Sequence, residues 1–332
     1  MQVIAITGAS GHIGAALVRQ LIDEGKIVKA LVHRQSASLQ GLPVEKVPGD
    51  ARDAAVMGRL VQDADLLINL AAKISIWKKD AASVLAQNTA ITRQTIQACL
   101  STPQPLPLIH FSSIHSLQVE PRDEPLDEQR PWVGDDGTAY EKSKVLGEQM
   151  VLEAVHHQGL QAVMINPTSV MGPYDFYPSL LGQALISMYR RRLPFLMQGG
   201  YDFVDVRDVA LATSRLINRF QAFSPGEKFI LSGRYQTLRE LSGLVNAVKG
   251  SAFPFVMVPP GVAKAVQPLV SAFSTLTGKP PLYTRESIDI LATGHTRISQ
   301  AKATRYLDFT PRPIADTVRD TLQWFKNQSF MQ

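Results

Sequence analysis

A glycine-rich turn near the N-terminus constrains the fold most strongly. It begins after a short apolar run, Val3-Ile4-Ala5-Ile6, and reads Thr7-Gly8-Ala9-Ser10-Gly11-His12-Ile13-Gly14. The residues that follow, 13–24, repeat their apolar side chains with helical spacing. Glycines between a strand and a helix allow a tight turn and close backbone approach to a phosphate, which the free amides at the helix start can bind. The order therefore predicts a parallel α/β sheet with a dinucleotide site at its first turn.

The rest of the first half alternates between strand-like and helix-like segments. Short apolar runs predict buried parallel strands, and amphipathic stretches between them predict helices. Such alternation predicts right-handed crossovers and a doubly wound parallel sheet, an α/β fold. The predicted strands are residues 3–6, 27–32, 64–70, 106–111 and 161–165, and the predicted helices are 13–24, 84–99 and 143–155.

Beyond about residue 170 the pattern loosens, and proline and glycine recur. A late strand is predicted at 229–231, and helices at 238–248 and 314–325. We expect residues 1–170 to form the cofactor-binding domain. Residues 171–332 are expected to form mainly a smaller substrate-binding lobe, interleaved with the sheet domain through segments that return to it.

The end of the second strand indicates which dinucleotide is bound. An acid about 20 residues beyond the glycines would bind the ribose 2′-hydroxyl of NAD. The sequence places His33 and Arg34 there, with no carboxylate. Arg34 could instead pair with a 2′-phosphate, which favours NADP. NAD stays possible, since His33 and Arg34 could belong to a solvated loop.

Tyr140 and Lys144 stand four residues apart in Tyr140-Glu141-Lys142-Ser143-Lys144. On a helix both side chains project from one face. A phenol has a pKa of about 10, and a fixed ammonium beside it would lower that pKa toward the range useful for proton transfer. The pair predicts general acid–base chemistry at Tyr140.

Together these motifs resemble the extended branch of the short-chain dehydrogenase/reductase superfamily, the Rossmann-fold branch that contains the NAD-dependent epimerases and dehydratases. The resemblance spans essentially the whole chain. It rests on the glycine turn, Gly49-Asp50, Asn69-Leu70-Ala71-Ala72, Asn88, Tyr140-x-x-Ser143-Lys144, Asn166-Pro167-Thr168-Ser169-Val170 and Val204-Asp205-Val206-Arg207-Asp208-Val209.

The resemblance implies a set of cofactor-binding residues. Asn166 stands where the family has an arginine, so the role of that side chain is open. Asn69 and Asn88 could equally be structural hydrogen-bonding residues. The implied set is Gly8, Ser10, Gly11, His12, Ile13, Gly14, His33, Arg34, Asp50, Ala71, Ala72, Asn88, Tyr140, Lys144, Pro167, Ser169 and Val170.

The resemblance also implies a third catalytic residue, a serine or threonine after the fifth strand. Ser113 is the expected residue, with Ser112 as the alternative. Ser113 would hold the substrate carbonyl, Tyr140 would donate the proton, and Lys144 would hold the cofactor ribose. His115 is expected to line the substrate site rather than to act as a base.

The residues after Ser113 resemble the dihydroflavonol reductase-like and 3β-hydroxysteroid dehydrogenase-like members. Sugar dehydratases carry an Asp-Glu pair where this chain has Ile114-His115, and sugar epimerases a Tyr-Gly where it has Ser116-Leu117-Gln118. The resemblance implies an NADP(H)-dependent reductase of a ketone or aldehyde, with a hydrophobic substrate. The alternatives are a nucleotide-sugar epimerase with tightly bound NAD, a sterol or steroid dehydrogenase, and an NADP-sensing regulator without activity.

Composition excludes several other classes. The net charge of +5 over 332 residues is too modest for a nucleic-acid-binding protein, and Arg190-Arg191-Arg192 is expected to be a solvated helix end. The lone Cys99 predicts no disulfide and no metal site, and suits a cytoplasmic protein. Prolines break the apolar stretch 252–278, which predicts a substrate wall or an interfacial patch rather than a spanning helix. A homodimer is implied only by the family.

Overall fold

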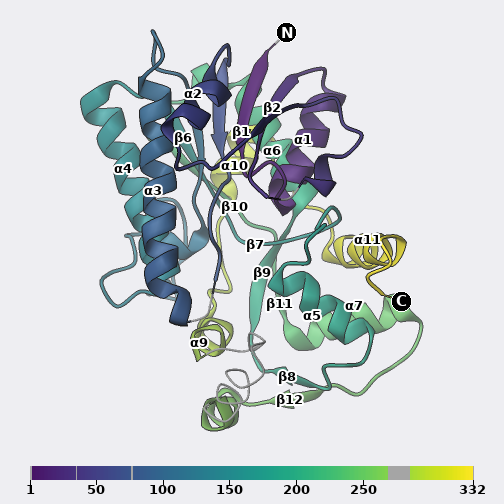
Figure 1. The fold of residues 1–332 in the computed structure, drawn as a ribbon. Coiled ribbons are helices and arrows are strands. Elements are labelled where there is room, and N and C mark those ends of the chain that lie inside the picture. Colours follow the sequence, from purple (N-terminus) through teal and green to yellow (C-terminus); the bar gives the residue numbers. More distant parts are fainter. Residues whose placement is uncertain (1, 35, 76–77, 268–284, 332) are drawn as a thin grey trace.

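A seven-stranded parallel sheet lies at the centre of the larger part of the molecule (Figure 1), with the strand order β10-β6-β5-β4-β1-β2-β3. The computed structural model describes residues 2–34, 36–75, 78–267 and 285–331. The order confirms the predicted doubly wound α/β fold. The strands are β1 (Val3–Thr7), β2 (Ile27–Val32), β3 (Glu45–Pro48), β4 (Leu66–Asn69), β5 (Leu108–Phe111), β6 (Ala162–Pro167) and β10 (Lys228–Leu231).

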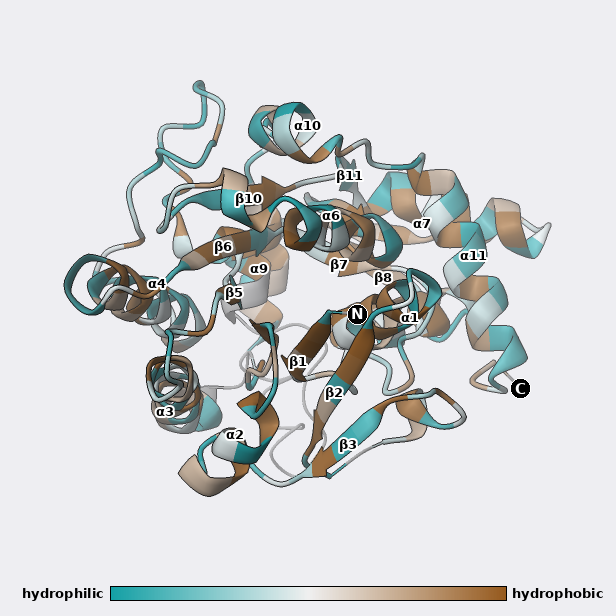
Figure 2. Cartoon of the chain, turned by 90° about the horizontal axis from the view of Figure 1, so that it is seen from above, coloured by the Kyte–Doolittle hydropathy of each residue, from teal (hydrophilic) through white to brown (hydrophobic). Residues whose placement is uncertain are grey.

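Helices cover both faces of this sheet (Figure 2). Side chains alternate along a strand, so Ile4 and Ile6 enter one core while Ala5 enters the other. Because both faces are buried, β1 is apolar up to its last residue, Thr7. One face carries α1 (His12–Asp23) and α6 (Val206–Asn218), and the other carries α2 (Ala54–Val61), α3 (Ala81–Leu100) and α4 (Ala139–Gln158).

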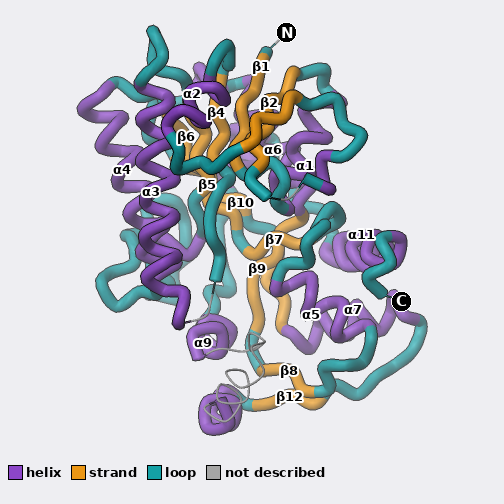
Figure 3. The backbone as a smooth tube through the Cα atoms, viewed as in Figure 1, coloured by secondary structure: helices purple, strands orange, loops and turns teal. Residues whose placement is uncertain are grey.

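A smaller lobe lies beyond the carboxyl ends of the parallel strands (Figure 3). It has its own apolar core, built mainly from helices and two small sheets. One sheet has the order β11-β9-β7, and the other pairs β12 with β8. Its elements are β7 (Ser169–Met171), α5 (Leu180–Tyr189), β8 (Phe195–Met197), β9 (Gly200–Asp205), β11 (Arg234–Thr237), α7 (Leu238–Lys249), β12 (Val256–Val258), α9 (Arg285–Thr293) and α11 (Ile314–Asn327).

Three later segments pack with the large sheet instead of the lobe. The strand β10 pairs with β6, α6 packs against α1, and α10 (Ala301–Leu307) lies against β10 and α6. The chain thus crosses repeatedly between sheet and lobe, and the space between them lies where parallel α/β sheets bind ligands.

The apolar stretch 252–278 lies only partly within the described residues. Its first part forms β12 and helical residues 260–267, and residues 268–278 lie outside the described ranges. Within those ranges no helix is both long and apolar enough to cross a membrane.

Candidate active site

The glycine turn is shaped by close backbone contacts. Gly8 has φ of +68°, and a Cβ there would lie 2.7 Å from the carbonyl carbon of Leu70. A Cβ on Gly14 would lie 2.3 Å from the Gly8 oxygen. Gly11 caps α1 without a side-chain hydrogen bond, and no acid occupies the first turn. The turn therefore has the space, the free amide donors and the dipole that a pyrophosphate requires.

A cavity of about 700 Å³ opens beside this turn. Its wall is built from residues that follow β1, β4, β5 and β6, so it lies at the carboxyl edge of the sheet. Twelve predicted site residues lie together in this wall: Gly8, Gly11, His12, Ile13, Gly14, Ala72, Ser113, Tyr140, Lys144, Pro167, Ser169 and Val170. Six do not contribute to it: Ser10, His33, Arg34, Asp50, Ala71 and Asn88.

The far end of the cavity is apolar and belongs to the lobe. Among the described residues that line the whole cavity, Lys144 is the only Lys or Arg, and it does not belong to this far end. This end therefore suits an uncharged, hydrophobic molecule. The apolar side chains come from α5, β9, α7 and α9, and include Leu180, Leu181, Met188, Phe203, Leu238, Leu241, Ile290 and Leu291.

His33, Arg34 and Asp50 lie near the ends of β2 and β3, outside the cavity. His33 and Arg34 are exposed. Asp50 accepts hydrogen bonds from the Arg52 guanidinium, which lowers the pKa of Asp50 to about 2, and its carboxylate lies 3.5 Å from His33. The Asp50 carboxylate is thus already paired with the Arg52 guanidinium, while Arg34 lies exposed at the surface.

Asn69 and Asn88 are buried hydrogen-bonding residues. Asn88 accepts a bond from the Lys73 amide at 2.7 Å and donates to Ser143 Oγ at 3.0 Å. Asn69 accepts from Thr7 Oγ1, whose oxygen in turn accepts from the Ala71 amide. Both asparagines hold the segment after β4, which brings Ala72 to the cavity, and neither lines the cavity itself.

Tyr140 and Lys144 lie at the start of α4. Thr138 caps this helix, and its side chain and that of Glu141 form a reciprocal capping box. This cap fixes the first turn, so Tyr140 and Lys144 face the cavity from one side of the helix. The Lys144 Nζ lies 5.8 Å from the centre of the Tyr140 ring.

The expectation that Lys144 lowers the pKa of Tyr140 is wrong for this structure. Burial raises the pKa of Tyr140 to about 12, although the interaction with the Ser113 side chain acts in the opposite direction. Lys144 instead donates to the Phe111 carbonyl at 3.0 Å, and burial lowers the pKa of Lys144 to about 8. At neutral pH Tyr140 is therefore a protonated phenol, the form that a proton donor needs.

The two serines after β5 have different partners. Ser112 donates to Glu148 at 2.6 Å, whereas Ser113 interacts with Tyr140 and accepts from the His115 amide. Of the two hydroxyls, the geometry favours Ser113 for contact with a substrate. His115 also lines the cavity, with Nδ1 3.9 Å from a Glu141 oxygen.

Glu148 is a functional candidate that the sequence analysis did not single out. It lies one turn beyond Lys144, is fully buried, and forms an ion pair with Lys228 at 2.8 Å. It accepts further hydrogen bonds from Ser112, Ser116, Trp132 and Asn166. Asn166 also donates to the Ser113 carbonyl at 3.0 Å. Asn166, which stands where the family has an arginine, thus connects Glu148 to the backbone of Ser113.

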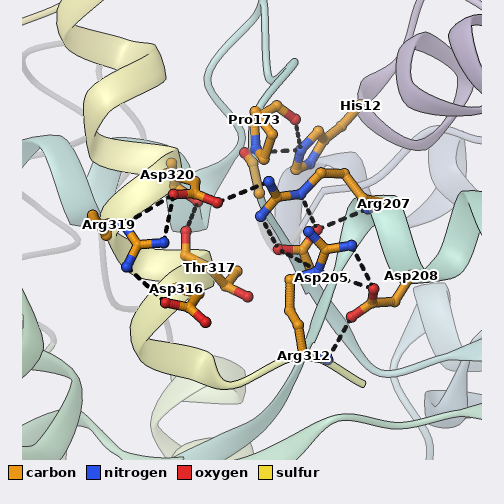
Figure 4. A network of polar contacts seen from close by, with 12 residues as sticks. His12, Pro173, Asp205, Arg207, Asp208, Arg312, Asp316, Thr317, Arg319 and Asp320 are labelled. Atoms are coloured by element: carbon orange, nitrogen blue, oxygen red, sulfur yellow. Dashed lines mark hydrogen bonds and ion pairs between the residues drawn. The ribbon is translucent and has the colours of Figure 1, made fainter. Parts of the chain in front are cut away.

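Residues 204–209, where β9 meets α6, form ion pairs with Asp320 on α11 and with Arg312 (Figure 4). Asp205 caps α6 and binds Arg207, which reaches Asp320 on α11 at 2.8 Å. Asp208 binds Arg312 at 2.7 Å. Nearby, His12 Nε2 lies 3.2 Å and 3.0 Å from the carbonyl oxygens of Gly172 and Pro173. This network fixes how the lobe sits on the glycine turn.

A family model described as the NAD dependent epimerase/dehydratase family matches residues 4–232. The chain belongs to this family. The match confirms the resemblance drawn from the motifs and makes the chain an NAD(P)-dependent enzyme of the extended short-chain dehydrogenase/reductase type.

Similar proteins in the family include reductases and epimerases. The chain is 29% identical to sterol demethylase protein B of Methylococcus capsulatus, over 98% of this chain and 99% of the relative. It is 28% identical to a putative dihydroflavonol 4-reductase of Synechocystis sp., over 98% and 95% of the two chains. The crystal structure of gox2253 superposes with a TM-score of 0.83 at 27% identity, covering 100% and 99%. UDP-glucose 4-epimerase of Thermotoga maritima shares the fold, with a TM-score of 0.78 at 18% identity and 99% of each chain covered.

Proposed function

We propose that the chain is an NADP(H)-dependent oxidoreductase that reduces the ketone or aldehyde group of a hydrophobic compound. The observation that carries this proposal is one cavity with the glycine turn at one end, Tyr140, Ser113 and Lys144 in its wall, and an apolar far end. When bound, the nicotinamide cofactor would supply the hydride. Tyr140 donates the proton to the carbonyl oxygen, Ser113 hydrogen-bonds that oxygen, and Lys144 holds the cofactor ribose.

Two observations favour this function over a nucleotide-sugar epimerase. A nucleotide sugar carries a diphosphate, but the described wall of the far end contains neither Lys nor Arg to pair with it. Two relatives that align over 98% of the chain are named for a sterol and for dihydroflavonol. The cytoplasmic location and the homodimer stay predictions.

The test is to follow NADPH absorbance with methyl ketones of increasing chain length and a 3-ketosteroid. We expect net oxidation of NADPH that improves with the apolar size of the compound. A nucleotide-sugar epimerase would instead retain bound NAD and show no net cofactor turnover. An NADP-sensing regulator would bind NADPH but oxidise it with none of these compounds.

Arg34→Ala tests the cofactor preference. A charge-assisted bond to the 2′-phosphate contributes about 1.5–3 kcal/mol, so kcat/KM for NADPH should fall roughly 10- to 150-fold. The value for NADH should change less than about twofold, because NADH has no such phosphate. Arg59→Ala, an exposed arginine on α2, is the control and should leave both values unchanged. A wild-type preference for NADH would contradict the assignment.

Burial lowers the pKa of Lys144 to about 8, which predicts an alkaline limb in the pH profile of kcat/KM, that is, a fall in kcat/KM at high pH. Above pH 8 the ammonium loses its proton, so kcat/KM should fall about tenfold for each further pH unit. Tyr140, with a pKa of about 12, stays protonated in this range. In Lys144→Arg any residual activity should lose this limb, because guanidinium does not deprotonate. A flat wild-type profile up to pH 10 would rule out a role for the Lys144 charge.

A further inference from the structure

We propose that the outer end of the lobe docks on an anionic lipid bilayer. This lobe tip consists of residues 189–198 and 245–267, which include β8, β12 and the helical residues 260–267. It lies at the end of the molecule away from the N-terminus (Figure 1).

Large apolar side chains are exposed on the lobe tip. Phe195 and Val256 face each other across β8 and β12 and are 58% and 52% exposed. Val262 and Val266, one helical turn apart, are 53% and 47% exposed. Elsewhere in the described chain only Ile74, near the cavity, exposes a larger fraction of a large apolar side chain. Several half-exposed apolar residues gathered at one end of a folded molecule are typical of an interaction surface.

The exposure is not a sign of poor packing, because the inner side of the tip is anchored. Leu196 and Met197 of β8 are buried in the core of the lobe. Phe255 and Ala263 pack against the same core from the two segments that carry Val256 and Val262. The tip is therefore a formed surface with one buried and one exposed side.

The charge of the tip is entirely positive. Its two segments contain five basic residues, Arg190, Arg191, Arg192, Lys249 and Lys264, and no Asp or Glu. The whole chain has 34 Lys and Arg against 29 Asp and Glu, so removing these five leaves 29 of each sign. The complete positive excess of the protein thus resides in the tip. One acid from outside it, Asp289 on α9, pairs with Lys264.

This combination fits the surface of an anionic bilayer. Apolar side chains such as Phe195 can enter the interfacial region, while arginines beside them meet lipid phosphates. Each basic residue near such a surface contributes about a fivefold factor in partitioning. A nucleic acid would match the charge but leave the exposed phenylalanine and valines in water. The tip also packs against the wall of the cavity, because Met188, Leu241 and Leu291 belong to the same core.

The test is co-sedimentation of the full chain with vesicles of phosphatidylcholine containing 30% phosphatidylglycerol, against vesicles of phosphatidylcholine alone. We expect binding to the anionic vesicles that weakens in 0.5 M NaCl. Arg191→Glu/Arg192→Glu should weaken it at least tenfold, and Phe195→Ser/Val256→Ser at least fivefold. The matched controls are Arg59→Glu on α2 and Ile27→Ser, which is 41% exposed on β2. Both should bind as the wild type does, and thermal unfolding establishes that every variant is folded.

Three results would overturn the proposal. These are absence of binding to anionic vesicles at low salt, equal losses in the tip variants and the controls, and self-association in solution that the Phe195→Ser/Val256→Ser change abolishes without any vesicle binding. The last result would show that the tip contacts a second copy of the chain instead of lipid.

Discussion

Tyr140→Phe is expected to lower kcat for carbonyl reduction by about 10²- to 10⁴-fold, the usual contribution of a positioned acid. The substitution removes only the hydroxyl, so the ring keeps its place beside Lys144 and His115. Binding of NADPH, measured by fluorescence titration, should change less than about threefold, because the glycine turn and Arg34 are untouched.

The effect should be specific to this tyrosine. Tyr306→Phe, on the exposed surface of α10, is the control and should keep wild-type kcat. Wild-type turnover in Tyr140→Phe would remove Tyr140 from the mechanism. A loss of NADPH binding as large as the loss of kcat would assign it a binding role instead.

Glu148→Ala is expected to lower the free energy of unfolding by about 3–5 kcal/mol, the usual cost of removing one partner of a buried ion pair. The change leaves Lys228, only 14% exposed, without its carboxylate, and removes the acceptor for Ser112, Ser116, Trp132 and Asn166. Urea unfolding measures the loss. Glu153→Ala, an exposed glutamate on the same helix, should cost less than about 0.5 kcal/mol.

The stability should also depend on pH through Glu148. Burial opposes ionisation of this group, but Lys228 and the two serine hydroxyls outweigh it and hold its pKa at about 2, below the usual 4.5. Because the pKa is lower in the folded state, the carboxylate stabilises the fold above pH 4.5. That stabilisation, roughly 3 kcal/mol, is lost as the pH falls toward 2. Glu148→Gln should lack this part of the acid dependence, and an unchanged acid profile in it would show that Glu148 does not carry the effect.

Strands of the sheet domain could be predicted from sequence where the residues of one segment alone indicate its structure. Strands buried on both faces read as apolar runs, and predicted strand 27–32 coincides with β2. The edge strand β3 gave no such run, since it carries Glu45 and Lys46 beside a single buried Val47. In the lobe, β8, β11 and β12 are three or four residues long, too short for a periodic signal.

Part of the cavity lining could be predicted from sequence, but the electrostatics of its residues could not. The spacing of Tyr140 and Lys144 and the family resemblance for Ser113 predicted three residues that do line one cavity. The pKa of Tyr140, however, depends on burial, which only the folded chain shows. Glu148 carried a signal, its position four residues after Lys144 on the same helical face. Nothing in the sequence showed that the side chain would be buried against Lys228 and Asn166.

The central claim is net hydride transfer to a carbonyl carbon. NADPH carrying deuterium at both C4 positions, incubated with the purified protein and the most active ketone of the series, tests it directly. Mass spectrometry of the alcohol should find one deuterium on the former carbonyl carbon for each NADPH consumed. A product without deuterium, or a full series of ketones that leaves NADPH unoxidised, would contradict it.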